Sequence, residues 1–464
     1  MSAPLIWIVF PIMISLLLII FGKNTRIVAV IAAFSSLILC LIALLIPNGI
    51  QNGEGLFLLK IEPELEVLGR QFFLPQEDNL LLVLIYGFGA IWFAGSLINE
   101  TSKYFPSLGM AFLALLIAAA SVDPFLYAAL LIEVAVLVCI PLLIRPGSVS
   151  NRGIFRFLIF QTLGMIFILL SGWFLAGGEI APVSELQLIQ AVALLGLGFA
   201  FWLAIFPLHT WIPMLIENVR PYSVGFVLSY LSFVGIIMLL EFLNRFTWLR
   251  EFIVVYPALR YLGVLMIVFA GFWSLFQKNL ERIFAYALIY ASGSSLINIG
   301  CIPDNGIYAY AARVLPNFLG ILLISWSMQL LLTRHKSLRL AEITGLADHF
   351  PFTVAAFLSG IFTISGLPLS PNYLANTLML DALSNYSVDL ASITLLGTFF
   401  LTLTSFRLSF RFLSSTQSVI EGREHIFEKI TLAFFICLVI ILGFLTPNFL
   451  YGMKYIFKGL KFLL

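Results

Sequence analysis

Long apolar segments recur along the whole chain and decide what it can fold into. Runs of eighteen or more apolar residues follow one another from Ala3 to Leu450, and a helix needs about 20 such residues to cross a bilayer. Only 10% of the 464 residues are charged, and 61% are hydrophobic, whereas soluble domains carry about 25% charged residues. The sequence therefore excludes a water-soluble fold and predicts an all-α polytopic membrane protein.

The apolar runs predict about fourteen transmembrane helices, each of roughly the length that a bilayer requires. The runs are continuous and lack the alternation of apolar and polar residues that membrane β-strands show. The predicted helices cover approximately residues 3–21, 26–46, 79–98, 105–121, 124–145, 153–177, 185–208, 222–243, 256–276, 279–301, 306–333, 350–369, 389–412 and 427–449.

Basic residues concentrate in alternate loops between these helices. Because Lys and Arg are enriched on the cytoplasmic side of membrane proteins, the pattern predicts an N-terminus outside. Arg245 and Arg250 are exceptions, and the C-terminal Lys454, Lys458 and Lys461 either lie along the lipid surface or mark an error near the end of this topology. The predicted inside loops hold Lys23, Arg26, Arg152, Arg156, Lys278, Arg282, Arg334, Lys336, Arg339, Arg411, Arg423 and Lys429.

The chain predicts one membrane domain over residues 1–464. Its parts are the first three helices in 1–104, a first repeat in 105–243, a second repeat in 256–412, and the last helix with a basic tail in 413–464. The only long polar loop is 47–78, where Leu56–Ile61 and Arg70–Leu74 are candidates for a short β-hairpin.

Glycine and proline interrupt two of the predicted helices. The first reads GLGFAFWLAIFPLHTWIP and the second TISGLPLSPNYLAN. Proline lacks a backbone donor and clashes with the preceding turn, and freed backbone groups survive at membrane depth only beside protein or water. Each break falls in the fourth helix of a five-helix block, which indicates two inverted repeats. The alternative is a pair of ordinary helices kinked by proline.

Cofactor and nucleic-acid sites have little support in the sequence. The net charge of +2 is small and scattered, unlike the basic surface of a nucleic-acid-binding protein. The chain has four cysteines and no CxxC, GxGxxG or P-loop motif, and cysteines in apolar runs are typical of buried side chains. We therefore expect no haem, iron–sulfur cluster, flavin, nucleotide or metal in this chain.

FPLHTWIP, from Phe206 to Pro213, closely resembles the signature after the seventh helix of the antiporter-like subunits of respiratory complex I and of Mrp-type antiporters. GFWSLFQKNLERIFAYALIYASG, SGLPLSPNYLAN and ALLIEVAVLVCIPLL resemble further segments of this family. The resemblance covers most of the chain. It implies a fold in which broken helices frame a row of ionisable residues at mid-membrane depth, along which the family pumps protons.

Position by position, the resemblance implies that most of this row is missing here. Glu133 stands at the position of the family's glutamate on the fifth helix. A buried lysine can exchange a proton because burial disfavours its charged form, which aromatic, aliphatic and amide side chains cannot do. The lysine, histidine and terminal acid positions of the family correspond to Trp202, Val234, Ala291, Val314 and Asn376.

Four ionisable residues within the predicted helices are candidates for a role in the membrane. Glu133 and His209 are candidates for a proton path; the alternatives are a neutral carboxylic acid bonded to a neighbouring helix and an imidazole that braces the turn after the break. Arg313 and Arg407 are structural candidates, because a guanidinium does not deprotonate in proteins. Arg313 is expected to anchor a carbonyl or a carboxylate, and Arg407 to pair with another subunit or to extend its charge towards the membrane surface.

The resemblance implies a non-catalytic membrane-arm subunit of a complex I-type NADH:quinone oxidoreductase, with proton translocation impaired by the missing lysines. The alternatives are a subunit of an Mrp-type cation/proton antiporter and a non-conducting structural subunit. The expected partners are lipid, other antiporter-like subunits and a peripheral redox arm that holds the flavin, the iron–sulfur clusters and the quinone. The expected location is the bacterial cytoplasmic membrane.

Overall fold

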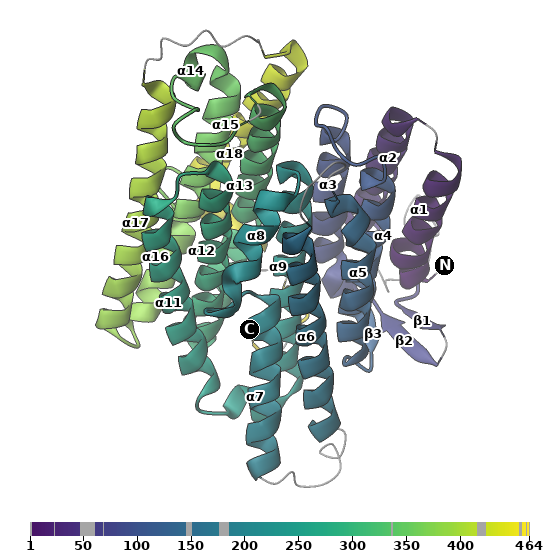
Figure 1. The fold of residues 1–464 in the computed structure, drawn as a ribbon. Helices are drawn as coiled ribbons and strands as arrows, with labels where there is room; N and C mark the ends of the chain where they lie inside the picture. Colours follow the sequence, from purple (N-terminus) through teal and green to yellow (C-terminus); the bar gives the residue numbers. More distant parts are fainter. Residues whose placement is uncertain are drawn as a thin grey trace. The chain divides into compact units, whose positions relative to one another are not determined.

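The computed structural model describes residues 2–22, 24–46, 61–67, 69–144, 151–175, 185–335, 337–414, 424–453, 457–460 and 462–463. Helices dominate this part of the chain (Figure 1). Nine of the described helices are long and apolar enough to cross a membrane, and five shorter ones are also apolar. The prediction of an all-α integral membrane protein is therefore confirmed.

The helices pack into two compact units. Unit 1 comprises Met1–Trp202, Ile237–Leu239 and Tyr455–Lys461, and unit 2 comprises Leu203–Ile236, Leu240–Lys454 and Phe462–Leu464. Each unit has a core of fully buried aromatic side chains, such as Trp92 in unit 1 and Tyr290 in unit 2.

Unit 1 is built from paired helices. Helix α2 packs on α3, α4 packs on α1 and α5, and α6 packs on α7. The Tyr86 hydroxyl donates to the main-chain oxygen of Trp7 and ties α3 to the first turn of the chain. The elements are η1 (Leu5–Val9), α1 (Phe10–Phe21), α2 (Thr25–Leu45), η2 (Gln76–Asp78), α3 (Asn79–Gly95), α4 (Phe105–Ser121), α5 (Tyr127–Leu143), α6 (Arg152–Leu175) and α7 (Glu185–Trp202).

A small antiparallel sheet in unit 1 corrects the predicted hairpin. Strand β2 (Arg70–Phe73) lies where the sequence predicts it, but it pairs with β1 (Glu64–Val67) and with β3 (Val122–Asp123). Of the predicted partner Leu56–Ile61, only Ile61 belongs to the described residues, and it is not in a strand. The shorter connection through Gly69, whose φ is +69°, allows the tight turn that joins β1 to β2.

Unit 2 also relies on close helix pairs. Gly271 of α11 faces Gly397 of α17, and a Cβ added at Gly271 would lie 2.2 Å from the Gly397 oxygen. Small residues allow such close approach of membrane helices. The elements are η3 (Leu208–Thr210), α8 (Trp211–Asn218), α9 (Pro221–Arg245), α10 (Thr247–Glu251), α11 (Val255–Phe276), α12 (Leu280–Gly300), η4 (Ile302–Asp304), α13 (Gly306–His335), α14 (Leu346–His349), α15 (Pro351–Ser365), α16 (Asn372–Ser384), α17 (Val388–Leu413) and α18 (Ile426–Met453).

Both predicted interruptions are present. Helix α7 ends at Trp202, earlier than the predicted 208, because Pro207 has no N–H to donate to the Leu203 carbonyl and its ring clashes with that carbonyl. Helix α15 ends at Ser365, and the chain turns through Gly366, whose φ is +70°. The sequence did not predict α8 and α16 as separate helices; at 8 and 13 residues they are shorter than a membrane span.

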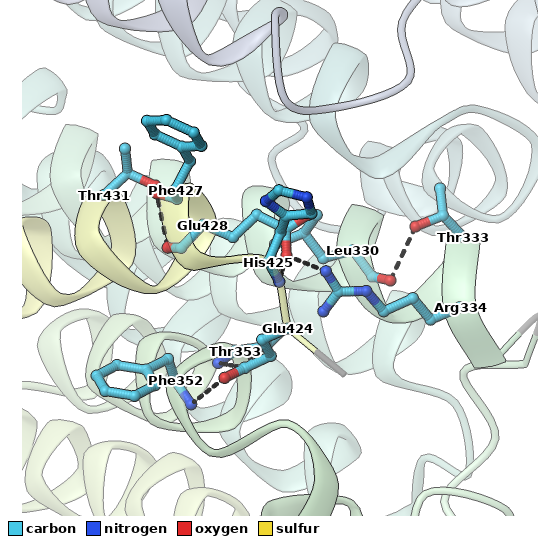
Figure 2. Close-up of polar contacts among 10 residues, drawn as sticks. All are labelled: Leu330, Thr333, Arg334, Phe352, Thr353, Glu424, His425, Phe427, Glu428 and Thr431. Atoms are coloured by element: carbon cyan, nitrogen blue, oxygen red, sulfur yellow. Dashed lines mark hydrogen bonds and ion pairs between the residues drawn. The ribbon is translucent and has the colours of Figure 1, made fainter. Parts of the chain in front are cut away.

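The buried carboxylate of Glu424 caps the N-terminus of α15 in unit 2 (Figure 2). Glu424 Oε1 accepts hydrogen bonds from Thr353 N at 2.7 Å and from Thr353 Oγ1 at 2.8 Å, and Oε2 accepts from Phe352 N at 3.4 Å. Beside it, Glu428 pairs with Arg334 of α13. A carboxylate at a helix N-terminus satisfies free amide groups and interacts well with the helix dipole.

Candidate functional site

Glu133 of α5 lies against α6 in unit 1. Its Oε1 accepts a hydrogen bond of 2.6 Å from the Thr162 hydroxyl. Its Oε2 is buried and has no hydrogen-bond partner in the part of the chain that the structure describes. The carboxyl group can thus carry a proton on Oε2 while Oε1 keeps its bond to Thr162.

Trp202, the last residue of α7, contacts the same turn of α6. The indole Nε1 donates a hydrogen bond of 3.0 Å to the main-chain oxygen of Gln161, the residue before Thr162. Gly164 makes room for the ring, because a Cβ added there would lie 2.3 Å from Trp202 Cδ1. The structure therefore brings Glu133 and Trp202 to neighbouring residues of one helix.

The chemistry of this pair differs from that of a carboxylate facing an ammonium group. An indole N–H is a donor only and does not accept a proton. Its one donor is used by Gln161, and Phe199 packs edge-on against the ring with centroids 6.0 Å apart. Trp202 is thus a packed, hydrogen-bonded side chain that cannot pass a proton on.

His209 lies in an aromatic pocket of unit 2. Its ring stacks on Phe206 with a centroid separation of 5.5 Å, and Phe269 contacts it edge-on at 4.7 Å. Its Nδ1 is buried and has no hydrogen-bond partner among the described residues. These contacts give the imidazole a packing role after the break of α7, and they offer Nδ1 neither a donor nor an acceptor.

Two of the positions for which the sequence predicts a missing ionisable group line one small cavity in unit 2. Ala291 of α12 and Val314 of α13 border a space of about 50 Å³. A polar cavity can hold a water molecule when it offers more than about 10–15 Å³ and several polar partners. Val234 is buried on α9 but does not border the space. The polar part of the cavity lining comes from Ser229, Ser232, Ser292, Ser295, Tyr310 and Asn317.

Asn376 and Arg313 meet where the second broken helix is interrupted. Arg313 of α13 is fully buried, and its Nη2 donates to Asn376 Oδ1 at 2.5 Å and contacts Met379 Sδ at 3.7 Å. The Asn376 amide in turn donates to the Ser365 main-chain oxygen at 3.2 Å. Arg313 therefore anchors a side-chain amide oxygen, and Asn376 connects it to the end of α15.

Arg407 of α17 binds within its own unit. Its Nη1 donates to the main-chain oxygen of Leu275 in the last turn of α11, one of the carbonyls that a helix end leaves without an intrahelical partner. Arg407 thus fastens α17 to the end of α11.

Sequence reasoning missed the residues that surround these positions. Thr162 and Gln161 carried no recognisable motif, although a glycine such as Gly164 within an apolar run does indicate a close contact. It also missed the ion pair that joins Arg282 of α12 to Glu217 of α8. Within the described residues no group of three His, Cys, Asp or Glu side chains could hold a metal ion.

Comparison with protein families and curated sequences gives consistent matches. The sequence model of the family described as "NADH:quinone oxidoreductase/Mrp antiporter, TM" matches residues 158–404. NAD(P)H-quinone oxidoreductase chain 4 2 of Microcystis aeruginosa is 30% identical over 237 residues, which is 48% of this chain and 42% of that one. The chain 4 protein of Gloeobacter violaceus is 25% identical over 345 residues, 68% of this chain and 65% of that one. The matches span less than two thirds of the length of either relative.

Solved structures match over nearly the whole length. A chain of respiratory complex I from Thermus thermophilus aligns with a TM-score of 0.79 at 17% identity and 99% coverage of both chains. A chain of the Mrp complex from a Dietzia species aligns with a TM-score of 0.78 at 12% identity, covering 99% of this chain and 97% of that one. At such low identity, these matches show a shared fold.

Proposed function

Because the chain belongs to the NADH:quinone oxidoreductase/Mrp antiporter transmembrane family, whose sequence model matches residues 158–404, we propose that it is a membrane-arm subunit of a complex I-type assembly with impaired proton translocation. The choice of a quinone-reducing assembly is supported by the curated relatives, which are named as NAD(P)H-quinone oxidoreductase chains. The proposal that proton translocation is impaired rests on side chains of unit 1.

The observation that supports impaired proton translocation is the environment of Trp202. In the resembling family a lysine stands here and faces the glutamate, whereas Trp202 is held by Gln161 and fills the space above Gly164. Glu133 can bind a proton, but Trp202 cannot accept it. Proton transfer from Glu133 therefore stops at this point of unit 1.

The proposed architecture has fourteen spans in one membrane domain, with two inverted five-helix repeats and the N-terminus outside. The nine long and five shorter apolar helices among the described residues support this number. The breaks after Trp202 and Ser365, in the fourth helix of each proposed repeat, support the inverted repeats. The proposed location is the bacterial cytoplasmic membrane. Exposed apolar side chains such as Phe34 and Phe410 would face lipid or partner subunits there.

The proposed partners are other antiporter-like subunits and a peripheral redox arm. In this assignment the flavin, the iron–sulfur clusters and the quinone belong to partner subunits, and this chain contributes no catalytic residue. Its own role is then to complete the membrane arm.

A subunit of an Mrp-type antiporter is the second candidate. It is favoured by the Mrp chain's TM-score of 0.78, nearly equal to the 0.79 of the complex I chain. Purification of the chain with its native partners through an affinity tag separates the two. Co-purifying iron–sulfur and quinone-binding proteins would support the redox assembly. Co-purification with antiporter subunits alone, together with sodium-dependent proton exchange, would overturn it.

A further inference from the structure

Arg313 is a cation without a counter-charge inside unit 2. Its side chain is fully buried, and a guanidinium stays charged in proteins. Its contacts are the neutral Asn376 and Met379, and it takes part in no ion pair with any described residue. Other arginines of unit 2 have partners: Arg282 pairs with Glu217, Arg334 pairs with Glu428, and Arg407 donates to a free carbonyl at a helix end.

Several donors at this place are unused. The Nε and Nη1 atoms of Arg313 are buried and have no hydrogen-bond partner in the described part of the chain. The hydroxyl of Tyr290, from α12, lies close enough to interact with Arg313 and Asn376, yet it makes no well-formed hydrogen bond among the described residues. Three donors without a partner among the described residues thus lie near one another, namely Nε and Nη1 of Arg313 on α13 and the hydroxyl of Tyr290 on α12.

Asn376 supplies no charge, and the bonds that it makes do not reach Nε or Nη1 of Arg313. Its oxygen is occupied by Nη2 of Arg313, and its amide nitrogen is directed to the Ser365 main-chain oxygen. Among the described residues, no oxygen atom accepts a hydrogen bond from Nε or Nη1 of Arg313. Buried N–H groups without an acceptor are costly, and a buried charge is costlier unless it is paired.

We propose that Arg313, together with Tyr290, binds a small monovalent anion such as chloride at the interruption of α15 and α16. Water molecules would satisfy the hydrogen bonds but leave the charge uncompensated, whereas an anion does both. The guanidinium edge and the hydroxyl provide few donors, and all of them are buried. That arrangement suits a single compact ion better than a phosphate or a carboxylate ligand, which presents more acceptor atoms.

The anion would hold the second broken helix in place. Arg313 reaches the end of α15 through Asn376 and Ser365, and one turn further along α13 Asn317 accepts a hydrogen bond of 2.8 Å from Asn372, the first residue of α16. An ion that fixes Arg313 therefore stabilises the contact of α13 with both halves of the interrupted segment. This role does not depend on the identity of the assembly or on proton transport.

The test is the thermal unfolding of the full-length chain in detergent, titrated with sodium chloride or bromide against sodium gluconate at constant ionic strength. An ion that binds only the folded state raises the unfolding midpoint with its concentration, and the rise continues as the site fills. We expect a rise of about 2 °C or more with chloride and bromide over gluconate. The absence of any such difference in the unaltered chain would overturn the proposal.

Two variants locate the effect. Arg313→Gln removes the cation, and Asn376→Asp places a carboxylate beside Nη2 that replaces the ion as counter-charge. The halide effect should disappear in both, and Asn376→Asp keeps the test valid if Arg313→Gln does not fold. Arg282→Gln is the matched control, because this arginine is half exposed and already paired; it should retain the halide effect. A halide effect that persists in Asn376→Asp, or that disappears in Arg282→Gln, would contradict the assignment to Arg313.

Discussion

Gly164 of α6 and Trp202 of α7 are fitted to each other. The indole ring lies so close to the glycine that an added Cβ would be 2.3 Å from Trp202 Cδ1 and 2.6 Å from Nε1. The same ring donates to the Gln161 oxygen one turn away. A tryptophan at this position is thus built into the packing of α6 on α7.

Gly164→Ala is expected to destabilise the folded chain. The new methyl group would collide with the indole, and over-packing of a core costs typically about 1–3 kcal/mol. Gly196→Ala on α7 is the control, because nothing lies within 4 Å of a Cβ added there, and alanine favours helix over glycine by about 1 kcal/mol. Thermal unfolding in detergent should place Gly164→Ala below the unaltered chain and Gly196→Ala at or above it. Equal midpoints for the two variants would show that the ring can move aside.

Trp202→Lys is expected to increase proton movement by the assembly. It installs an ammonium group near Glu133, and a well-placed acid–base group accelerates proton transfer by about 10²-fold or more. The measurement is substrate-driven acidification of membrane vesicles that carry the assembly. Trp202→Met controls for the loss of the ring without adding a charge, and it should give no increase. An increase of the same size with Met would assign the effect to the space vacated by the ring.

His209→Phe is expected to leave both stability and proton movement unchanged. The imidazole is packed between Phe206 and Phe269, and its Nδ1 is buried without a partner among the described residues. A phenyl ring keeps these contacts and removes the buried polar atom, whereas His209→Ala leaves a cavity that costs roughly 2–5 kcal/mol. Loss of proton movement in His209→Phe at unchanged stability would assign the imidazole to a proton path.

Glu424→Ala is expected to lower the stability of the chain. It removes the acceptor of the Thr353 amide and hydroxyl bonds (Figure 2), and leaving such buried donors unsatisfied costs about 1–3 kcal/mol. Glu424→Gln keeps one acceptor oxygen and should lose less. Glu342→Ala is the control, because Glu342 is 47% exposed and 4.0 Å from its partner Arg339. Equal unfolding midpoints for Glu424→Ala and Glu342→Ala would show that Glu424 does not stabilise the start of α15.

The fold could be predicted from the sequence wherever the residues of a segment themselves indicate its structure. Apolar runs located the long helices, and Pro207 and Gly366 located the breaks, because proline and glycine act on the backbone beside them. The short helices α8 and α16 carry no such signal, and the pairing of β2 with β3 depends on residues about fifty positions away.

The candidate site could be predicted only in part, because its side chains bind residues that lie far away in the sequence. Glu133 is conspicuous in an apolar run, but its partner Thr162 is 29 residues away. The contact of Arg313 with Asn376 joins residues separated by 63 positions. Such contacts depend on which helices pack together, and no local pattern encodes that. The convergence of unused donors near Arg313 was therefore visible only in the structure.

The central claim is that proton movement through this chain is impaired because the path from Glu133 ends at Trp202. The most direct measurement compares substrate-driven proton movement, per electron transferred, in assemblies that carry the unaltered chain or Glu133→Gln. Glutamine keeps the size of the side chain and an oxygen for the Thr162 hydroxyl bond, but it cannot carry a proton. The account predicts equal proton movement in the two assemblies. A loss of more than half in Glu133→Gln, at an equal amount of assembled protein, would contradict it.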